Sequence, residues 1–333
     1  MSGTGIAGTP GVGLPARDSD AREARTVILW VVVLGILWGS AFPVIRAGLV
    51  AGAAPLVFAA IRYALTAVAL VAIALGTRAE LPRARDLLAP MIFGGLLMIG
   101  LYGGLLYLGE GTTPGGLAAV LTASAPLASA VLGYRWFPSE RFGNWGTAGL
   151  AVGFVGVGIL VLPQLVVPSV IGFEGPALVV GAVLAFSVGS VLLRRTSRTT
   201  PGLWTLSVQF ATAAALVSAL ALATGEPLAL GNGSTVLPAL TFLVVLPGIF
   251  GYSLYFHLHH RAGPSRANIV GYVNPVTGVV VGLLLFAEVV TAVEIAGLLL
   301  IAGGLFLLQR DRARSAASAR ARPPVAGLDL KKS

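Results

Sequence analysis

Polar and aromatic side chains that lie deep within long apolar stretches are the residues of this chain that could bind a solute. Serine, threonine and asparagine supply hydrogen bonds, and tyrosine and tryptophan add a flat apolar surface to a donor, which suits an amphipathic molecule. Hydroxyl groups in apolar helices also bond to their own helix or a neighbour, so a structural role stays open for each serine and threonine. The predicted binding residues are Trp38, Ser40, Tyr102, Thr122, Ser187, Tyr252 and Asn274.

Arg62 is the charged residue that falls inside an apolar stretch. A charge at the centre of a bilayer costs ~2.5–3.5 kcal/mol on insertion scales, so its side chain should face protein, a cavity or the interface. It could pair with a carboxylate or phosphate of a substrate. It could instead bond main-chain carbonyls or extend to the outer headgroups, which its position one third along the span permits, and we favour this structural interpretation.

Three histidines, His257, His259 and His260, lie near the end of one apolar stretch. Positions 257 and 260 share a helix face, which makes a metal site conceivable. The chain has no cysteine and this stretch has no acidic residue, so interfacial histidines without a metal are favoured. Because imidazole titrates near neutral pH, His257 could also carry or sense protons.

The sequence lacks the residues that several kinds of chemistry require. The absence of cysteine excludes disulfides and thiolate chemistry. No GxxxxGK[ST] loop is present, and the only lysines are Lys331 and Lys332, so ATP is not expected to drive this protein. No acidic residue falls in the middle of an apolar stretch, which argues against a deep carboxylate that exchanges protons for a cationic drug. No HExxH motif or Ser/His/Asp set fits an intramembrane protease, and we expect neither an enzyme nor a cofactor.

The apolar stretches that carry these residues correspond to ten membrane spans. A helix needs about 20 apolar residues to cross roughly 30 Å of hydrocarbon. The chain is 56% hydrophobic and 11% charged with a mean hydropathy of +0.90, too little charge for the surface of a soluble protein of this length. Tyr107 and Tyr255 lie nearer the span ends and are interpreted as interfacial anchors. We therefore predict an all-α polytopic membrane protein with spans at 26–46, 54–75, 87–108, 114–136, 144–162, 175–194, 202–223, 236–258, 266–287 and 291–309.

Prolines lie near the midpoints of three spans. They are Pro126 in span 4, Pro247 in span 8 and Pro275 in span 9. A proline inside a helix frees a main-chain carbonyl, which a membrane tolerates only beside protein partners or a watery cavity. Helix breaks at matching depths in two halves of a chain favour a central binding site, although a kink for packing alone is the other interpretation.

The second half of the chain repeats features of the first. Because each half holds five spans, an odd number, the two copies must be inverted relative to each other across the membrane. Three pairs of residues recur, the first 149 residues apart and the others 148: Pro126/Pro275, Glu140/Glu288 and Gly149/Gly297. The predicted parts are a disordered N-terminal segment 1–25, a first repeat 27–162, a second repeat 175–309 and a disordered basic tail 310–333.

Basic residues are sorted to one side of this topology. With the N-terminus in the cytoplasm, all but two of the 22 lysines and arginines fall in cytoplasmic segments. This sorting predicts that both termini are cytoplasmic. The tail lacks aromatics among its charges, so we interpret it as an orientation signal that attracts anionic lipid and not as a nucleic-acid site. The acidic residues expected at the opposite face are Glu110, Glu174, Glu226, Glu288 and Glu294.

The order and spacing of several motifs resemble the EamA-like transporter family of the drug/metabolite transporter superfamily. The resemblance covers residues 27–309 and implies a ten-helix inner-membrane carrier, often an exporter of amino acids or related metabolites. The second half departs from the pattern, with Ser187-Val188-Gly189-Ser190 in place of Trp-Gly-Ser and no arginine after its glutamate. The motifs that carry the resemblance are Trp38-Gly39-Ser40-Ala41-Phe42, Arg62-Tyr63, Pro126, Ser139-Glu140-Arg141, Gly149, Asn274-Pro275, Ala287-Glu288 and Gly297.

We therefore expect a secondary transporter whose repeats rock against each other around a site formed by spans 1, 3, 4, 6, 8 and 9. Its expected partners are a small metabolite and the lipid bilayer. A flippase for lipids or lipid precursors on the same fold is one alternative, and a membrane scaffold or sensor without transport is another. The sequence leaves the substrate, the direction, the coupling ion and the oligomeric state open, a homodimer included.

Overall fold

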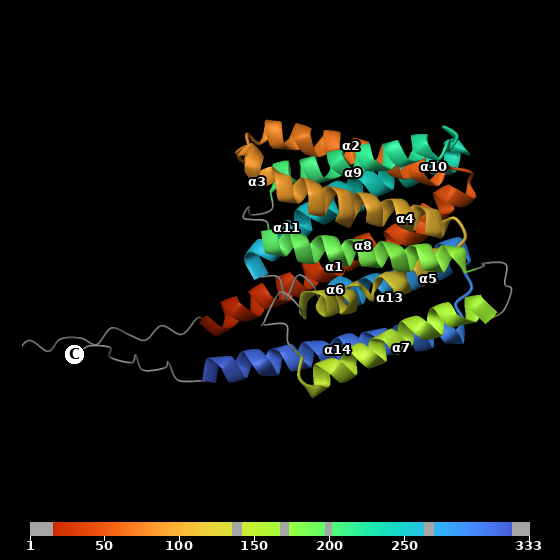
Figure 1. Cartoon of the computed structure of the whole chain (residues 1–333). Coiled ribbons are helices and arrows are strands. Elements are labelled where there is room, and N and C mark those ends of the chain that lie inside the picture. The colour runs from red at the N-terminus through yellow and green to blue at the C-terminus, as the bar shows by residue number, and fades with distance from the viewer. Residues whose placement is uncertain (1–15, 135–141, 167–172, 197–201, 263–269, 322–333) are drawn as a thin grey trace, which may run out of the picture.

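The computed structural model describes residues 16–134, 142–166, 173–196, 202–262 and 270–321, and the regular elements in these ranges are all helices. They lie side by side in one elongated bundle (Figure 1). This outcome follows from the composition, because a chain in hydrocarbon must satisfy its main-chain hydrogen bonds internally and a helix does so within each segment.

The first repeat contains eight helical segments in the described residues. They are α1 (Ala16–Val50), α2 (Pro55–Gly76), α3 (Ala84–Ala89), the π-helix η1 (Pro90–Leu101), α4 (Tyr102–Glu110), α5 (Gly115–Thr122), α6 (Ala125–Tyr134) and α7 (Asn144–Val166). The second repeat follows the same plan. Its described segments are α8 (Glu174–Thr196), α9 (Leu203–Ala223), α10 (Gly233–Leu243), the π-helix η3 (Val244–Gly251), α11 (Tyr252–Ala262), α13 (Val270–Phe286) and α14 (Ala292–Ala321).

Ten apolar segments cross the bundle. Within the described residues, nine are long and apolar enough to span a membrane, and a tenth, Val273–Phe286, is apolar but shorter. They follow the order of the ten predicted spans, so the prediction of an all-α polytopic fold is confirmed. The first and last helices run further than predicted, because α1 begins at Ala16 and α14 continues to Ala321. The alanine- and arginine-rich composition of these extensions favours helix.

Helix packing displays the inverted repeat. The second helix of each repeat packs on its counterpart, as α2 does on α9, and the fifth does likewise, as α7 does on α14. The α1–α13 contact of one side is matched by contacts of α8 with α5 and α6 on the other. In Figure 1 the α2–α9 pair forms one edge of the bundle and the α7–α14 pair forms the opposite edge. The central helices between these pairs are those that carry the predicted binding residues.

Close approach of α7 and α14 depends on glycine. A Cβ atom on Gly149 would lie 2.6 Å from the carbonyl oxygen of Gly304, and one on Gly304 would lie 2.5 Å from that of Gly149. Both distances are too short for a real side chain, so the two backbones meet where neither has one. Small residues at helix contacts are typical of membrane bundles, in which helices gain van der Waals contact by approaching closely.

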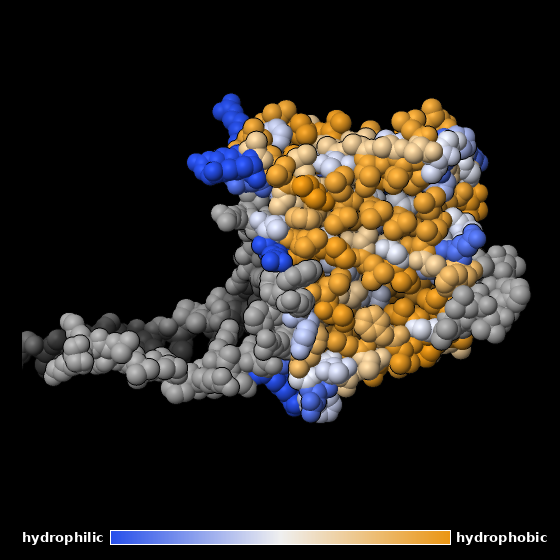
Figure 2. Space-filling model, in the orientation of Figure 1, coloured by the Kyte–Doolittle hydropathy of each residue, from blue (hydrophilic) through white to orange (hydrophobic). Residues whose placement is uncertain are grey.

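The surface between the two ends of the bundle is apolar. Figure 2 shows hydrophobic residues over the middle of one face and hydrophilic residues at its two ends. Large apolar side chains such as Val68, Leu222 and Leu284 are exposed in the described chain. Lipid is the solvent that such a surface requires. The described chain begins and ends at the same end of the bundle, which we call the terminal end, and we call the opposite end, where α4 ends and α5 begins, the distal end (Figure 1).

Candidate functional site

Aromatic rings from five helices form a continuous chain through the interior. Its members, Trp38 of α1, Tyr252 of α11, Phe210 of α9, Tyr63 of α2 and Tyr107 of α4, are called here the aromatic cluster. Successive ring centroids lie 5.1, 5.0, 5.9 and 6.4 Å apart, distances at which aromatic pairs attract. The cluster joins both repeats and includes two of the predicted binding residues, Trp38 and Tyr252.

Arg62 lies against this cluster. Its side chain is only 8% exposed, and its Nη1 donates a hydrogen bond to the hydroxyl of Tyr107 at 3.0 Å. Its Nε has no partner, its guanidinium lies 5.7 Å from the ring centroid of Tyr63, and no carboxylate among the described residues forms an ion pair with it. Burial is inconsistent with the interpretation that Arg62 extends to the headgroups. Arg62 is therefore a buried cation that forms no ion pair within the described residues, although the Glu110 carboxylate lies within electrostatic range of it.

The interpretation of two tyrosines from sequence is wrong. Tyr107 is expected to be an interfacial anchor, but its side chain is fully buried and bonds to Arg62. Tyr255 is half-buried and its ring lies 5.3 Å from that of Trp38, so it packs in the interior as well. Distance along a span does not reveal which side of the helix a ring faces, and tertiary packing turns both rings inward.

A π-helix precedes each of the predicted tyrosines. Tyr102 follows η1 directly and Tyr252 follows η3 directly, in the third spans of the two repeats. Pro247 lies inside η3, and Trp38 donates from its indole nitrogen to the Pro247 carbonyl at 3.1 Å. A π-helix in a longer helix is uncommon and is frequently found at functional sites. Tyr102 lies within electrostatic range of Tyr252 and Arg62, so these residues share one region.

Span 4 is broken at its predicted proline. Helix α5 ends at Thr122 and α6 begins at Ala125, with Pro126 in its first turn. Ser187 of α8 donates to the main-chain carbonyl of Ala125 at 3.2 Å, which joins α8 to the start of α6 beside the break. Past this point α6 packs chiefly against α8, whereas α5 also packs against α1 and α13. The exposed position of Pro126 is in keeping with this looser packing toward the terminal end.

The other predicted residues bond to main chain. Thr122 donates to Ala119 at 2.9 Å and Ser40 donates to Leu37 at 3.1 Å, each within its own helix. With its amide nitrogen oriented toward them, Asn274 donates to the carbonyls of Gly35 and Val270 at 3.3 and 3.1 Å. These bonds are structural, although Thr122 and Asn274 keep part of their surface exposed.

Pro275 and His257 differ from the rest. Pro275 is buried within α13, which continues through it without interruption. His257 is exposed on α11, while the side chains of His259 and His260 lie outside the described residues. No group of three potential metal ligands occurs in the described part of the chain. The Glu140 motif also lies outside the described residues.

Two charged side chains join helix ends at the distal end. The carboxylate of Glu288, between α13 and α14, accepts hydrogen bonds of 2.8 Å from the main-chain nitrogens of both Gly115 and Gly116 at the start of α5. Arg46 of α1 donates to the main-chain carbonyls of Glu110 and Gly111 at the end of α4. An anion at a helix start and a cation at a helix end both interact favourably with the helix dipole. We call this arrangement the distal latch.

Sequence reasoning assigns no role to the latch residues. Arg46, Glu110 and Glu288 lie near span ends, where charged residues are usually solvated. The signal that could find them is the recurrence of Glu140 and Glu288 in the two repeats, together with the glycine pair at the start of span 4. A small residue at a helix start lets another side chain approach the main-chain nitrogens.

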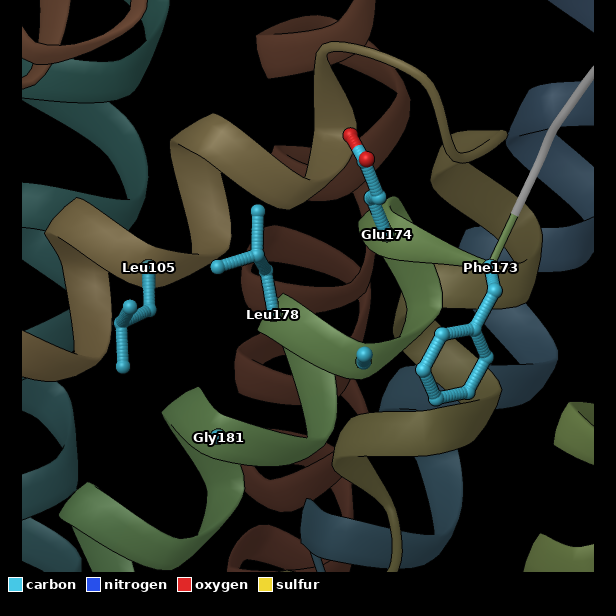
Figure 3. A pocket seen from close by; sticks show the side chains of 6 residues that line it. Leu105, Phe173, Glu174, Leu178 and Gly181 are labelled. Atoms are coloured by element: carbon cyan, nitrogen blue, oxygen red, sulfur yellow. The ribbon is translucent and has the colours of Figure 1, made fainter.

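A surface depression lies elsewhere, on the outer side of α4 and α8. Figure 3 shows its lining, which is apolar apart from Glu174 at the start of α8. None of the predicted binding residues lines it. Its lining residues are Leu105, Phe173, Glu174, Ala177, Leu178 and Gly181.

Comparison with known proteins places the chain in a family. The model of the EamA-like transporter family matches residues 25–162 and again residues 174–310. The chain is 26% identical over 303 residues to the uncharacterized transporter YvbV of Bacillus subtilis, covering 89% of this chain and 95% of that protein. It is 40% identical over 135 residues to a probable terminal-alkyne amino-acid exporter of Streptantibioticus cattleyicolor, covering 40% of this chain and 44% of that one.

A solved crystal structure shares the fold. It superimposes with a TM-score of 0.60 and 19% sequence identity, covering 86% of this chain and 99% of the other. The repeated match of one family model to both halves agrees with the helix pairing described above. The chain therefore belongs to the EamA-like transporter family.

Proposed function

We propose that this protein is a secondary transporter that exports amino acids or related small metabolites by alternating access. The observation that carries the proposal is Arg62, a buried guanidinium without an ion-pair partner among the described residues, next to aromatic rings from both repeats. The family supplies the transport function, and the relative named as an amino-acid exporter supports the choice of substrate.

A carboxylate is the ligand that Arg62 suits best. Its planar guanidinium can donate two parallel hydrogen bonds to a carboxylate, and such charge-assisted bonds are stronger than neutral ones. The partnerless Nε leaves one of these donors free. Trp38, Tyr102 and Tyr252 are half-buried beside it and offer apolar surface with a few donors, which fits the rest of an amino acid.

Alternating access is supported by the unequal packing of the two ends. At the distal end the latch joins α1, α4, α5 and the segment that follows α13. Toward the terminal end, α6 packs chiefly on α8, whereas α5 packs on α1, α8 and α13. Inverted repeats that rock about a central site would exchange these two arrangements during each cycle.

The distribution of charge favours a cytoplasmic terminal end. Arg78, Arg83 and Arg85 lie around the connection of the second and third spans there, and Arg194 and Arg195 lie in the last turn of α8 there. Basic residues in short loops are retained on the cytoplasmic side of a membrane. In this orientation the described conformation is closed toward the outside, and the transporter stands ready to receive substrate from the cytoplasm.

Counterflow in proteoliposomes tests the function. Vesicles loaded with unlabelled L-amino acids should take up a radiolabelled L-amino-acid mixture faster than protein-free vesicles or vesicles loaded with buffer. Amino-acid amides, which lack the carboxylate, serve as matched control ligands and should not support this exchange. Equal uptake by protein-containing and protein-free vesicles would refute the proposed substrate class.

A cysteine pair tests the orientation, because the natural chain has no cysteine. Leu228→Cys lies in the α9–α10 connection at the distal end, and Leu81→Cys lies between α2 and α3 at the terminal end; both side chains are highly exposed. A membrane-impermeant maleimide added to intact cells should label the first and not the second. The reverse pattern would overturn the orientation.

A further inference from the structure

Glu110 is a buried carboxylate that makes no hydrogen bond. It is the last residue of α4, its side chain is 0% exposed, and neither of its carboxylate oxygens has a partner in the described part of the chain. Nearby Thr113, also 0% exposed, leaves its hydroxyl without a partner as well. Glu288, at the same end of the bundle, is bonded through both oxygens. Two acidic residues in one region are therefore in opposite situations.

The charged groups around Glu110 are engaged elsewhere. Arg46 donates to the main-chain carbonyl of Glu110 and not to its carboxylate, and Arg62 donates to Tyr107. The other charged group in electrostatic range is Glu288, which carries the same sign. Tyr102 and Tyr107 lie within electrostatic range of Glu110 on its own span, and the acidic residue at the start of α8, Glu174, is exposed.

Burial favours a neutral group in such a position. An ionised carboxylate without donors costs far more to bury than a neutral carboxylic acid does, and the like charge of Glu288 adds to that cost, while Arg62 and Arg46 offset part of it from a distance without bonding to the carboxylate. The main-chain nitrogens that could have stabilised an anion here, those of Gly115 and Gly116, are already occupied by Glu288. The closed distal end thus has room for one stabilised carboxylate and not for two.

We propose that Glu110 binds the proton of a proton/substrate exchange, and that this proton holds the distal latch closed. The inference rests on the proposed function for the substrate half of the exchange. Loss of the proton leaves two like-charged carboxylates in one poorly hydrated region. Separating α5 from Glu288, which opens the distal end, relieves that repulsion by admitting water.

The exchange follows from this switch. With the distal end open, a proton from the outside adds to a carboxylate oxygen of Glu110, and the latch closes. From the closed form the proton leaves toward the cytoplasm as substrate binds, and the ionised Glu110 then favours distal opening and substrate release. Each cycle moves one proton inward and one substrate molecule outward, so the proton gradient drives export.

Cysteine accessibility tests the switch without a substrate. In a Thr122→Cys background, a membrane-impermeant maleimide outside the cell reports opening of the distal end, because Thr122 lies at the break that follows α5. Labelling should rise several-fold from acidic to alkaline external pH. Glu110→Gln, which stays neutral, should give low labelling at every pH, and Glu110→Asp should restore the pH response.

Matched variants separate this result from misfolding. Glu174→Gln alters an exposed acid at the same end and should leave the pH response of Thr122→Cys unchanged. Leu228→Cys combined with Glu110→Gln should label as strongly as Leu228→Cys alone, which shows that the variant reaches the membrane folded. If labelling of Thr122→Cys follows pH equally with and without the Glu110→Gln substitution, the proposal is overturned.

Proteoliposomes test the coupling with the same radiolabelled L-amino-acid mixture. An acidic vesicle interior should drive uptake, and a gradient of about one pH unit supports up to roughly tenfold accumulation per proton, equivalent to about 1.4 kcal/mol. A sodium gradient should have no effect. Counterflow without acceleration by the pH gradient would overturn proton coupling and leave the proposed function intact. A pH switch that needs Glu110, together with no amino-acid counterflow, would refute the substrate class alone.

Discussion

Charged side chains in the interior and at the helix ends of the two repeats differ in how well their hydrogen bonds are satisfied. In the first repeat, Arg62 keeps a nitrogen and Glu110 keeps both carboxylate oxygens without a hydrogen-bond partner among the described residues. In the second repeat, Glu288 bonds to the start of α5, and Asp311 accepts a bond of 2.7 Å from the main-chain nitrogen of Gly143, just before α7. The second repeat therefore supplies anions that hold helix starts of the first.

This difference separates two uses of charge. A buried charge with all its bonds made contributes to a particular arrangement of helices, since breaking such a contact is costly. A buried charge whose donors or acceptors lack partners is poorly stabilised by the protein alone. A ligand can supply the missing hydrogen bonds, and a proton can neutralise a carboxylate. The unsatisfied charges Arg62 and Glu110 of the first repeat are therefore the candidates for ligand and proton binding, and Glu288 and Asp311 of the second repeat hold helix starts of the first. Three substitutions test this division, in order of expected effect.

Replacing Arg62 should have the largest effect on transport and little on stability. Arg62→Gln removes the cation that we propose binds the substrate carboxylate, so substrate binding should weaken by ~2–5 kcal/mol and counterflow should fall roughly 30-fold or more. Thermal unfolding in detergent should change little, because the lost bond to Tyr107, worth ~1.5–3 kcal/mol as a bond to a charged group, is offset by removal of a buried charge that has no ion pair. Arg62→Lys keeps the charge but loses the paired N–H donors of the planar guanidinium, and it should transport at an intermediate rate. Counterflow equal to that of the parent in both variants would show that Arg62 has a structural role and does not bind the substrate.

Replacing Glu288 should weaken closure of the distal end. Glu288→Gln keeps one acceptor but loses the charge, and hydrogen bonds to charged groups are worth ~1.5–3 kcal/mol. The closed form should lose about that much relative to the open form, which raises maleimide labelling of Thr122→Cys from the outside by about tenfold or more if the open form is rare. Glu294→Gln, at the start of α14, is the control and should not raise labelling. An unchanged labelling level in Glu288→Gln would contradict the latch.

Replacing Asp311 should have the smallest effect, on stability alone. Asp311→Asn keeps the shape and weakens the bond to Gly143, which costs about 1 kcal/mol, typical of the loss of a favourable helix-start contact. Arg310 and Arg314 still stack on Trp145 at 5.3 and 5.7 Å and keep α14 against α7. The unfolding temperature should fall slightly while counterflow stays within about twofold. A large loss of counterflow with normal stability would show that Asp311 takes part in transport and is not only a structural residue.

The prolines show how far sequence symmetry predicts structure. Pro126 and Pro275 recur at equivalent positions, yet span 4 breaks into α5 and α6 while α13 continues through Pro275 without a break, and a hinge at Pro275 stays a prediction. A rocking pair of inverted repeats must adopt two different conformations at once, because one end is closed while the other is open. The sequence carries the symmetry of the pair, and one conformation of the protein cannot display it fully.

Sequence alone was sufficient for the number, order and inversion of the spans, and for Trp38, Tyr102 and Tyr252 as interior residues. The length of each apolar stretch and the odd number of spans in each half determine these features. The bilayer imposes the length on every helix separately. The role of Tyr107, the burial of Glu110 and the bonds of Glu288 depended on which helices meet, and on how deeply. Whether a charge near the end of a span is solvated or buried depends on the neighbours that cover it, so only the packed bundle could decide it.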